Sequence, residues 1–172
     1  GTVGVESEEG VGSSFSFTAR FERQLHAPLS VAVSEDALEG VRVLGQDNNL
    51  TNRRVLSGIL ESRKCRHTEV DSGAAALEDL RAAARTKDPY RIAILDMVTK
   101  DIPGEDLGRQ IKADSLIAGT TLVMMTSVGR RGDVSRFREA GFSGYLTKPV
   151  KASHLLSLLA TLTGRPADQA TG

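Results

Sequence analysis

The sequence predicts a doubly wound α/β domain that is built on a five-stranded parallel sheet and preceded by a β-hairpin. From Val41 onward, short apolar runs alternate with stretches of helical period, and about 125 residues contain five such repeats. Parallel strands need crossover connections, which the intervening helices supply. Residues 1–24 instead alternate between apolar and polar side chains, as paired antiparallel strands do.

The hairpin is predicted from two alternating runs, residues 2–7 and 14–21, which flank a glycine-rich turn at residues 9–13. An isolated two-stranded hairpin is marginally stable in water, so we expect this one to pack on sequence upstream of the chain. Residues 25–39 contain Pro28 and lack a sustained period, which is typical of a linker.

The five predicted strands are short apolar runs with turn signals at their ends. They cover residues 41–44, 67–70, 92–95, 121–125 and 144–146. Between and after these runs, helical segments carry apolar side chains on one face, around Leu56, Leu77, Leu107 and Leu155. The fourth helix in chain order, near residues 131–140, is short and mostly polar, so we expect it to be exposed.

The composition argues against several functions. The chain has 172 residues, with 22 Lys and Arg against 22 Asp and Glu, and this balance disfavours nucleic-acid binding, which needs a basic surface. The single cysteine, Cys65, cannot form an internal disulfide, and no Cys/His cluster has zinc spacing, so a reducing, cytoplasmic compartment is expected. No apolar run approaches the roughly 18 residues of a membrane span, so neither membrane insertion nor secretion is expected.

Polar side chains follow four of the predicted strands at their carboxyl ends. Asp47 and Asn48 come after the first strand, and Asp96 ends the third. Thr126 ends the fourth strand, and Lys148 follows the fifth. In a doubly wound sheet, ligands bind at this edge, near the point where the strand order reverses. The sequence therefore predicts one polar cluster there.

This arrangement resembles the receiver domain of two-component response regulators, in particular receivers fused to hybrid histidine kinases. The likeness spans about residues 41–163, and it also includes the strings at residues 51–54, 95–97, 126–133 and 145–150. It implies a flavodoxin-like fold with strand order 2-1-3-4-5. The turn at residues 10–15 is similar to the last glycine-rich turn of a histidine-kinase ATPase domain.

The two resemblances together imply a domain order. Residues 1–24 would be the C-terminal hairpin of the ATPase domain, 25–39 a linker, 40–164 the receiver and 165–172 the start of a further linker. The parent chain would be a histidine kinase in a phosphorelay, and its catalytic domains and a second receiver would be the partners of this domain. The fragment itself would be noncatalytic.

The resemblance also assigns roles to the strand-end residues. The Asp96 carboxylate would accept a phosphoryl group from a phosphohistidine, and Thr126 and Lys148 would contact the phosphoryl oxygens. Mg²⁺, which prefers oxygen ligands, would be held by the side chains of Asp47, Asn48 and Asp96 and by the backbone carbonyl of Val98.

Three departures from the family pattern fall in this pocket. Asn48 replaces an acid and removes one negative charge beside the metal; a unit charge pair about 4 Å apart is worth roughly 4 kcal/mol at an effective dielectric of about 20. Gly45 weakens the first strand, and Gln46 needs hydrogen-bond partners if it is buried. Lys100 stands where the family has a proline and would place an ammonium near Asp96. These changes favour a degenerate pseudo-receiver in which Mg²⁺ binding is weakened or lost.

The alternative is an ordinary receiver in which Asn48 still ligates the metal and Asp96 is phosphorylated. Asp96, Thr126 and Lys148 are all retained, and they favour this alternative. A third interpretation is an interaction module without a small ligand.

A second candidate site lies on the face of the fourth helix, fifth strand and fifth helix, through which receivers dock on partners. This face carries Arg130, Arg131, Arg136, Tyr145 and Lys151 in a chain without net charge. Guanidinium groups bind phosphates and guanine edges, and tyrosine rings stack on bases. Similarity to hybrid kinases with a pseudo-receiver that responds to cyclic di-GMP implies this ligand. Its main contacts would be Arg131 and Tyr145, with Arg130 and Lys151 beside them.

The remaining features have structural interpretations. Cys65 has no basic motif beside it, which predicts a buried, unreactive thiol. Residues 71–73 are typical of a turn and helix cap. Asp101 is either a surface acid or a substitute metal ligand, and the surface interpretation is favoured.

Overall fold

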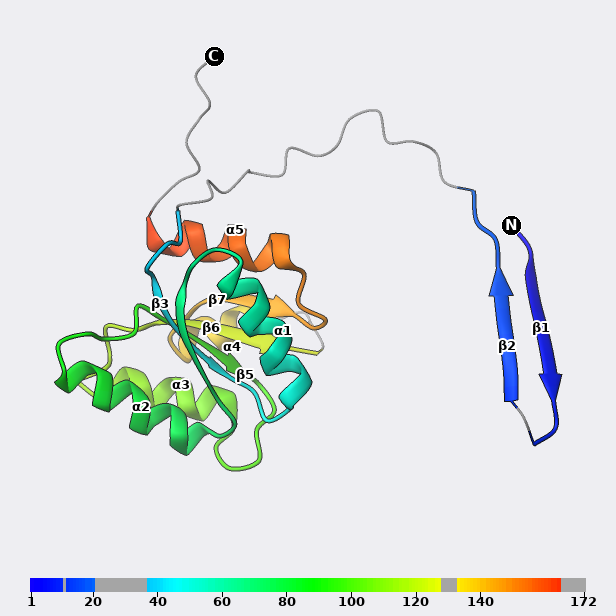
Figure 1. The fold of residues 1–172 in the computed structure, drawn as a ribbon. Helices are drawn as coiled ribbons and strands as arrows, with labels where there is room; N and C mark the ends of the chain where they lie inside the picture. The colour runs from blue at the N-terminus through cyan, green and yellow to red at the C-terminus, as the bar shows by residue number, and fades with distance from the viewer. Residues whose placement is uncertain (11, 21–36, 128–132, 165–172) are drawn as a thin grey trace, which may run out of the picture. The chain divides into compact units, whose positions relative to one another are not determined.

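Five parallel strands form the central sheet of the larger of two compact units in the chain (Figure 1). The computed structural model describes residues 1–10, 12–20, 37–127 and 133–164. The strands of the sheet are β3 (Arg42–Gln46), β4 (Arg66–Val70), β5 (Ile92–Asp96), β6 (Thr121–Thr126) and β7 (Phe142–Thr147). They lie in the order β4-β3-β5-β6-β7, and every neighbouring pair is parallel. Counted within the sheet this is the order 2-1-3-4-5, so the predicted doubly wound topology is confirmed.

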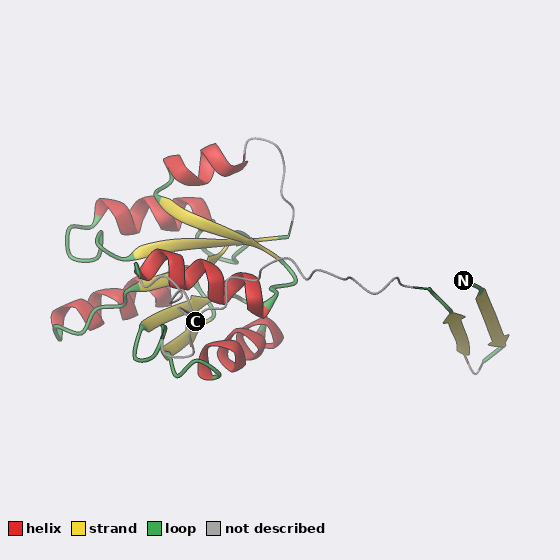
Figure 2. Cartoon of the chain, turned by 90° about the horizontal axis from the view of Figure 1, so that it is seen from above, coloured by secondary structure: helices red, strands yellow, loops and turns green. Residues whose placement is uncertain are grey.

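Helices cover both faces of the sheet (Figure 1, Figure 2). One face carries α1 (Leu50–Glu61) and α5 (Ala152–Thr163), and the other carries α2 (Gly73–Arg85), α3 (Gly104–Ala113) and α4 (Asp133–Glu139). The helix predicted to be exposed, α4, is short but anchored: Phe137 is only 2% exposed and packs edge-on against Phe142 of β7. Phe137 therefore anchors this mostly polar helix on the sheet.

The central strand β5 is buried along its whole length, as expected for a parallel strand covered on both faces. Ile92 and Ile94 belong to the core under α1 and α5, while the residues between and after them, Ala93 and Leu95, belong to the core under α2 and α3. Each fully buried aliphatic side chain contributes roughly 1.5–3 kcal/mol to stability. Leu38, within the range predicted as a linker, is fully buried in the first of these cores.

Local signals in the sequence account for several helix ends and for the cysteine. The Ser72 hydroxyl accepts a hydrogen bond from the Ala75 N–H (3.3 Å) and caps α2, which confirms the predicted cap. Cys65 is buried and its thiol donates to the Leu38 carbonyl (3.5 Å). Burial raises the pKa of this thiol, as a buried, unreactive cysteine requires. None of the helices that the structure describes has both the length and the apolar character needed to cross a membrane.

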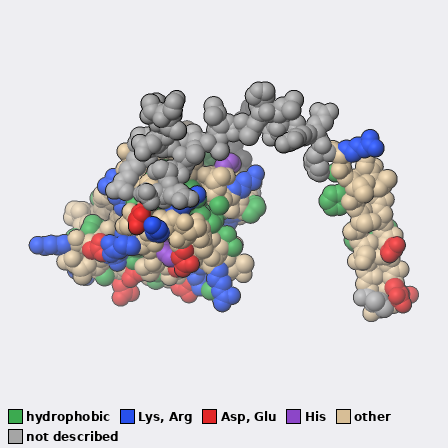
Figure 3. Space-filling model, turned by 45° about the horizontal axis from the view of Figure 1, so that its top comes forward, with side chains coloured by type: hydrophobic (Ala, Val, Ile, Leu, Met, Phe, Trp, Pro, Cys, Tyr) green, Lys and Arg blue, Asp and Glu red, His purple; other side chains and the backbone are tan. Residues whose placement is uncertain are grey.

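The smaller unit contains the predicted hairpin, formed by β1 (Val3–Glu8) and β2 (Gly12–Phe17). The strands are antiparallel, and Val3 pairs with Phe17 while Val5 pairs with Phe15. Because alternate pairs share a face, these four side chains stand together on one side of the hairpin, each at least 60% exposed. Hydrophobic side chains are accordingly visible on the hairpin surface (Figure 3). The packing of the hairpin on further sequence stays a prediction.

Candidate functional site

The carboxyl ends of the strands meet at a pocket in which Lys148 links two acids. Asp47 directly follows β3 and Asp96 ends β5, and both carboxylates are almost fully buried. The Lys148 ammonium lies 2.7 Å from Oδ2 of Asp47 and 2.9 Å from Oδ2 of Asp96. Burial alone would lower the pKa of Lys148, but the hydrogen bonds and charges of the two carboxylates outweigh it and raise this pKa. The lysine is therefore a fixed positive charge at the centre of the pocket.

Asp47 is fully engaged by the start of α1. Its Oδ1 accepts from the Asn49 N–H (2.8 Å), and its Oδ2 accepts from the Asn52 amide (3.0 Å) in addition to Lys148. The Asp47 backbone carbonyl accepts from the Arg53 guanidinium (2.8 Å). Asn52 and Arg53 were not predicted as site residues. The only signal for them was the family-like string at residues 51–54, which carried no assigned role.

The two unusual residues at the end of β3 have structural causes. A Cβ on Gly45 would lie 2.7 Å from Cδ2 of Leu56, so the glycine allows α1 to approach the strand closely. Gln46 is fully buried and its Oε1 accepts a hydrogen bond from the Asp96 backbone N–H (3.1 Å). Its Nε2 has no hydrogen-bond partner among the described residues. Of the hydrogen-bond partners that Gln46 was predicted to need, the structure provides one for Oε1, and this bond fixes the backbone of Asp96.

Asp101 ties the loop after β5 to the start of α2. Its carboxylate accepts from the N–H groups of Ala74 (2.9 Å) and Gly73 (3.0 Å) at the start of α2, and these bonds lower the pKa of Asp101. Asp101 is exposed, so the surface interpretation fits the structure and its role is to cap a helix. Lys100 is exposed and has no ion pair with any residue in the described part of the chain, so the ammonium beside Asp96 is that of Lys148.

Thr126 completes the pocket as the sequence predicted. Its side chain is buried at the end of β6, and its hydroxyl donates to the sulfur of Met97 (3.3 Å). Its backbone carbonyl accepts from the Lys148 N–H (2.8 Å), which ties the lysine to this strand. The predicted ligand Val98 lies two residues after Asp96, with its side chain 66% exposed.

The predicted metal ligands are oxygen donors, which Mg²⁺ prefers, but they do not fit the ion as they stand. Only Asp47 and Asp96 are charged, and Lys148 is already bonded to both of them. Asn48, half-buried beside Asp47, contributes an amide instead of a third negative charge. In the part of the chain that the structure describes, no group of three or more His, Cys, Asp and Glu side chains could hold a metal.

The second candidate site is only partly described. Arg130 and Arg131 lie outside the described residues. Tyr145 on β7 is 43% exposed, and its ring lies 6.3 Å from that of Phe137 at a tilt of 50°. Lys151 is exposed at the start of α5. Beside Tyr145 is a hollow of about 270 Å³ that is also lined by Val134, Phe137, Arg138 and Leu158.

Arg136 does not join the cations of this face. Its guanidinium is 2.7 Å from a carboxylate oxygen of Glu105 on α3 and lies over the Phe137 ring. Spacing along the sequence could not reveal this pairing, because Glu105 lies on a different helix.

Comparisons with known proteins agree with this fold. The sequence model described as the response regulator receiver domain matches residues 43–160. The two-component response regulator ORR11 of Oryza sativa subsp. indica is 31% identical over 137 residues, which cover 78% of this chain and 90% of the rice protein.

Solved structures give the same result. The receiver domain of the sensor histidine kinase PA1611 from Pseudomonas aeruginosa PAO1, with magnesium coordinated in its active site cleft, is 26% identical with a TM-score of 0.62. The alignment covers 73% of this chain and 98% of that domain. The chemotaxis response regulator CheY4 of Vibrio cholerae, 20% identical with a TM-score of 0.64, shares the fold over 72% of this chain and 98% of its own.

The fold and the acidic pocket at its carboxyl edge define a receiver-type α/β domain. The chain belongs to the response regulator receiver family of two-component signalling.

Proposed function

We propose that this receiver is a regulatory pseudo-receiver of a hybrid histidine kinase, which acts by docking on neighbouring domains and by binding cyclic di-GMP. The observation that carries the first part is the charge of the pocket. Two carboxylates face one ammonium at 2.7 and 2.9 Å, and the position beside them is the neutral Asn48. Without a metal the pocket therefore has a net charge of only minus one, and a divalent cation has to displace Lys148 from its acids.

The ligand is assigned to the face formed by α4, β7 and α5. Cyclic di-GMP has two phosphodiester charges and two purine faces, so it needs cations and flat stacking surfaces together. Tyr145 supplies a half-exposed ring next to a hollow, and Lys151 supplies an exposed ammonium at the start of α5. Arg131 and Arg130 are assigned from the sequence. A ligand can release a docked domain only if it binds the free state more tightly, so the nucleotide and the docked partner would share this surface.

The test is a calorimetric titration of the chain with cyclic di-GMP. We expect saturable binding that is weakened about tenfold or more in Arg131→Ala and Tyr145→Ala, since each removes a charged or stacking contact. Tyr145→Phe keeps the ring and should keep most of the affinity. Arg109→Ala, an exposed arginine on α3 paired with Asp106, is the matched control and should bind normally. Unchanged affinity in both site variants would refute this site.

The second candidate function is that of an ordinary phosphoacceptor, because Asp96, Thr126 and Lys148 are gathered at one edge of the sheet. Incubation with acetyl phosphate and Mg²⁺, followed by intact-mass measurement, separates the two functions. The pseudo-receiver predicts little or no added phosphoryl mass. Rapid stoichiometric modification that disappears in Asp96→Asn would establish the phosphoacceptor instead. The kinase catalytic domains and a second receiver as partners, and a cytoplasmic location, are parts of the proposal that rest on the sequence.

A further inference from the structure

Three arginines meet at the amino ends of the strands, the edge of the sheet opposite the acidic pocket. Arg42 begins β3 and Arg66 begins β4, and the two residues are direct partners in the sheet register. Arg91 precedes β5, and its N–H donates to the Arg42 carbonyl (2.9 Å). The strand order β4-β3-β5 therefore places three like charges side by side, an arrangement that is unfavourable unless an anion lies between them.

The Asp88 carboxylate neutralises part of this positive charge. Asp88 Oδ2 accepts from Arg42 (3.0 Å), and the same carboxylate accepts two hydrogen bonds from Arg66 in a forked arrangement. The hydrogen bond from Arg66 is the main reason that the pKa of Asp88 is lowered, so this carboxylate is negative at neutral pH. The Arg42 guanidinium also lies over the Tyr90 ring, 4.2 Å from its centroid, which fixes its orientation.

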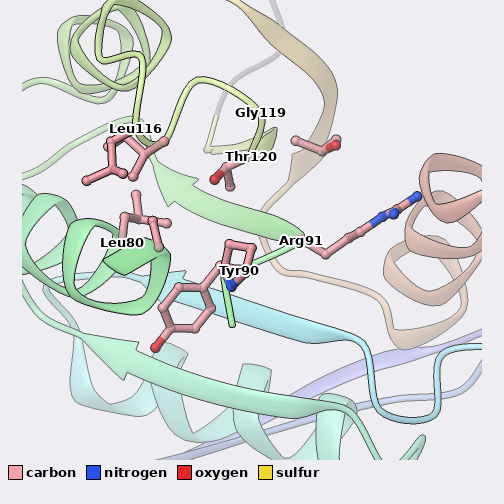
Figure 4. A pocket seen from close by; sticks show the side chains of 10 residues that line it. Leu80, Tyr90, Arg91, Leu116, Gly119 and Thr120 are labelled. Carbon is pink, nitrogen blue, oxygen red and sulfur yellow. The ribbon is translucent and has the colours of Figure 1, made fainter. Parts of the chain in front are cut away.

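Arg91 has no carboxylate partner among the described residues. A guanidinium has five N–H donors, and the described acceptor of Arg91 is the carbonyl of Thr163 at the end of α5 (3.4 Å). Figure 4 shows the Arg91 side chain extending toward α5, away from Leu80 and Leu116. The favourable interaction of a cation with a helix C-terminus explains part of its position and leaves most of its donors available. The hollow that these arginines line also has a second carboxylate, that of Glu39, but this is paired with the Lys64 ammonium (3.3 Å). Three guanidiniums against the Asp88 carboxylate therefore leave an excess of two positive charges in a chain that is neutral overall.

These arginines line a hollow of about 310 Å³, which we name the arginine hollow (Glu39, Gly40, Val41, Arg42, Arg66, Asp88, Pro89, Arg91 and Thr163). A second hollow of about 520 Å³ adjoins it and shares Pro89 and Arg91, with Leu80, Tyr90 and Leu116 in its wall (Figure 4). A small molecule with an anionic group and a less polar body fits the two together. Planar guanidiniums match the oxygen geometry of a phosphoryl group, and a dianion matches the excess charge.

We propose that the arginine hollow is a binding site for the phosphoryl group of a small molecule. The site is separate from the pocket at Asp96 and from the face at Tyr145, and it does not depend on the function proposed above. Asp88 acts as an internal competitor that shares the same arginines, so its removal should strengthen binding and not abolish it.

The test is a calorimetric titration of the full chain with pyrophosphate, first at low ionic strength and then at about 150 mM salt, where exposed charges are screened. We expect saturable binding at one site that Arg91→Gln weakens about tenfold or more, because a charge-assisted hydrogen bond is lost. Asp88→Asn should tighten binding several-fold. Arg109→Gln on α3 is the matched control and should bind like the parent chain. Arg91→Gln removes one long hydrogen bond, so circular dichroism should show a folded domain.

Several outcomes of these titrations would overturn the proposal. Absence of saturable binding, or the same loss in Arg109→Gln as in Arg91→Gln, would mean an adventitious ion only and would overturn the proposal. Weaker binding in Asp88→Asn would overturn it as well, because the cluster would then be a structural ion pair alone. A parallel titration with GDP identifies the source of the phosphoryl group: tighter binding than pyrophosphate indicates a nucleotide, and equal binding indicates an inorganic anion.

Discussion

The missing charge at position 48 allows a direct test of the pocket, in which Asn48→Asp restores a third carboxylate. A unit charge about 4 Å from a divalent ion at an effective dielectric of about 20 is worth roughly 8 kcal/mol before hydration, twice the value for a pair of unit charges. Desolvation and repulsion from the buried carboxylates of Asp47 and Asp96 oppose this gain. We therefore expect a net gain of about 2–3 kcal/mol, or Mg²⁺ binding about 30- to 150-fold tighter.

Calorimetry is the appropriate assay, because the chain has no tryptophan to report binding by fluorescence. Asn49→Asp is the matched control: it adds the same charge one residue further on, where the side chain caps α1. This control should raise Mg²⁺ affinity by no more than about twofold, since an exposed charge is screened by solvent. Equal Mg²⁺ affinity in the parent chain and in Asn48→Asp would show that the charge deficit has no consequence. An equal gain in Asn49→Asp would show that the effect is not local.

The other predictions concern stability and can be measured by urea unfolding. Lys148→Met leaves two buried carboxylates without their counter-charge and should lower the free energy of unfolding by about 3–5 kcal/mol. Lys64→Met on the surface should lower it by less than about 1 kcal/mol. Similar losses of stability in the two variants would contradict the role of Lys148 as the central counter-charge. Asp101→Ala removes the bonds to the start of α2 and should cost about 1 kcal/mol at neutral pH. Because the pKa of Asp101 is lowered in the fold, its contribution to stability is present above about pH 4 and is lost as the pH falls further. The difference in stability between Asp101→Ala and the parent chain should therefore vanish in acid. Gly104→Ala would place a Cβ 2.4 Å from the Asp96 carbonyl oxygen and should destabilise the domain by at least about 1–3 kcal/mol. Gly58→Ala on α1 has open space and should stabilise the domain by about 0.5–1 kcal/mol. Unchanged stability in Gly104→Ala would show that α3 can move without strain.

The fold could be predicted from the sequence because its signals are local and repeated. Alternating apolar runs and helical stretches fix the strands and helices, and right-handed parallel crossovers restrict the topology to few choices. The strand-end rule then places Asp47, Asp96, Thr126 and Lys148 at one edge, where the structure has them.

Other features depend on contacts between distant parts of the chain. Asp101 looked like a surface acid, but its function as a cap for α2 depends on a helix that begins 28 residues earlier. Gln46 reaches the backbone of Asp96, 50 residues away, and no periodicity encodes that bond. The pairing of Arg42 and Arg66 with Asp88 requires the strand register, which a hydrophobic pattern fixes only indirectly.

The bond between Lys148 and Asp47 also has a consequence for the order of assembly. It joins residues 101 positions apart, and the lysine directly follows β7, the last strand of the sheet to leave the ribosome. Until that strand docks, the carboxylates at the ends of β3 and β5 repel each other without a counter-ion from the chain, so a partly folded intermediate lacking β7 should keep this edge open and hydrated. Closure of the acidic edge is therefore a late event in folding, and a chain truncated before position 148 would build the sheet at the cost of unneutralised charge.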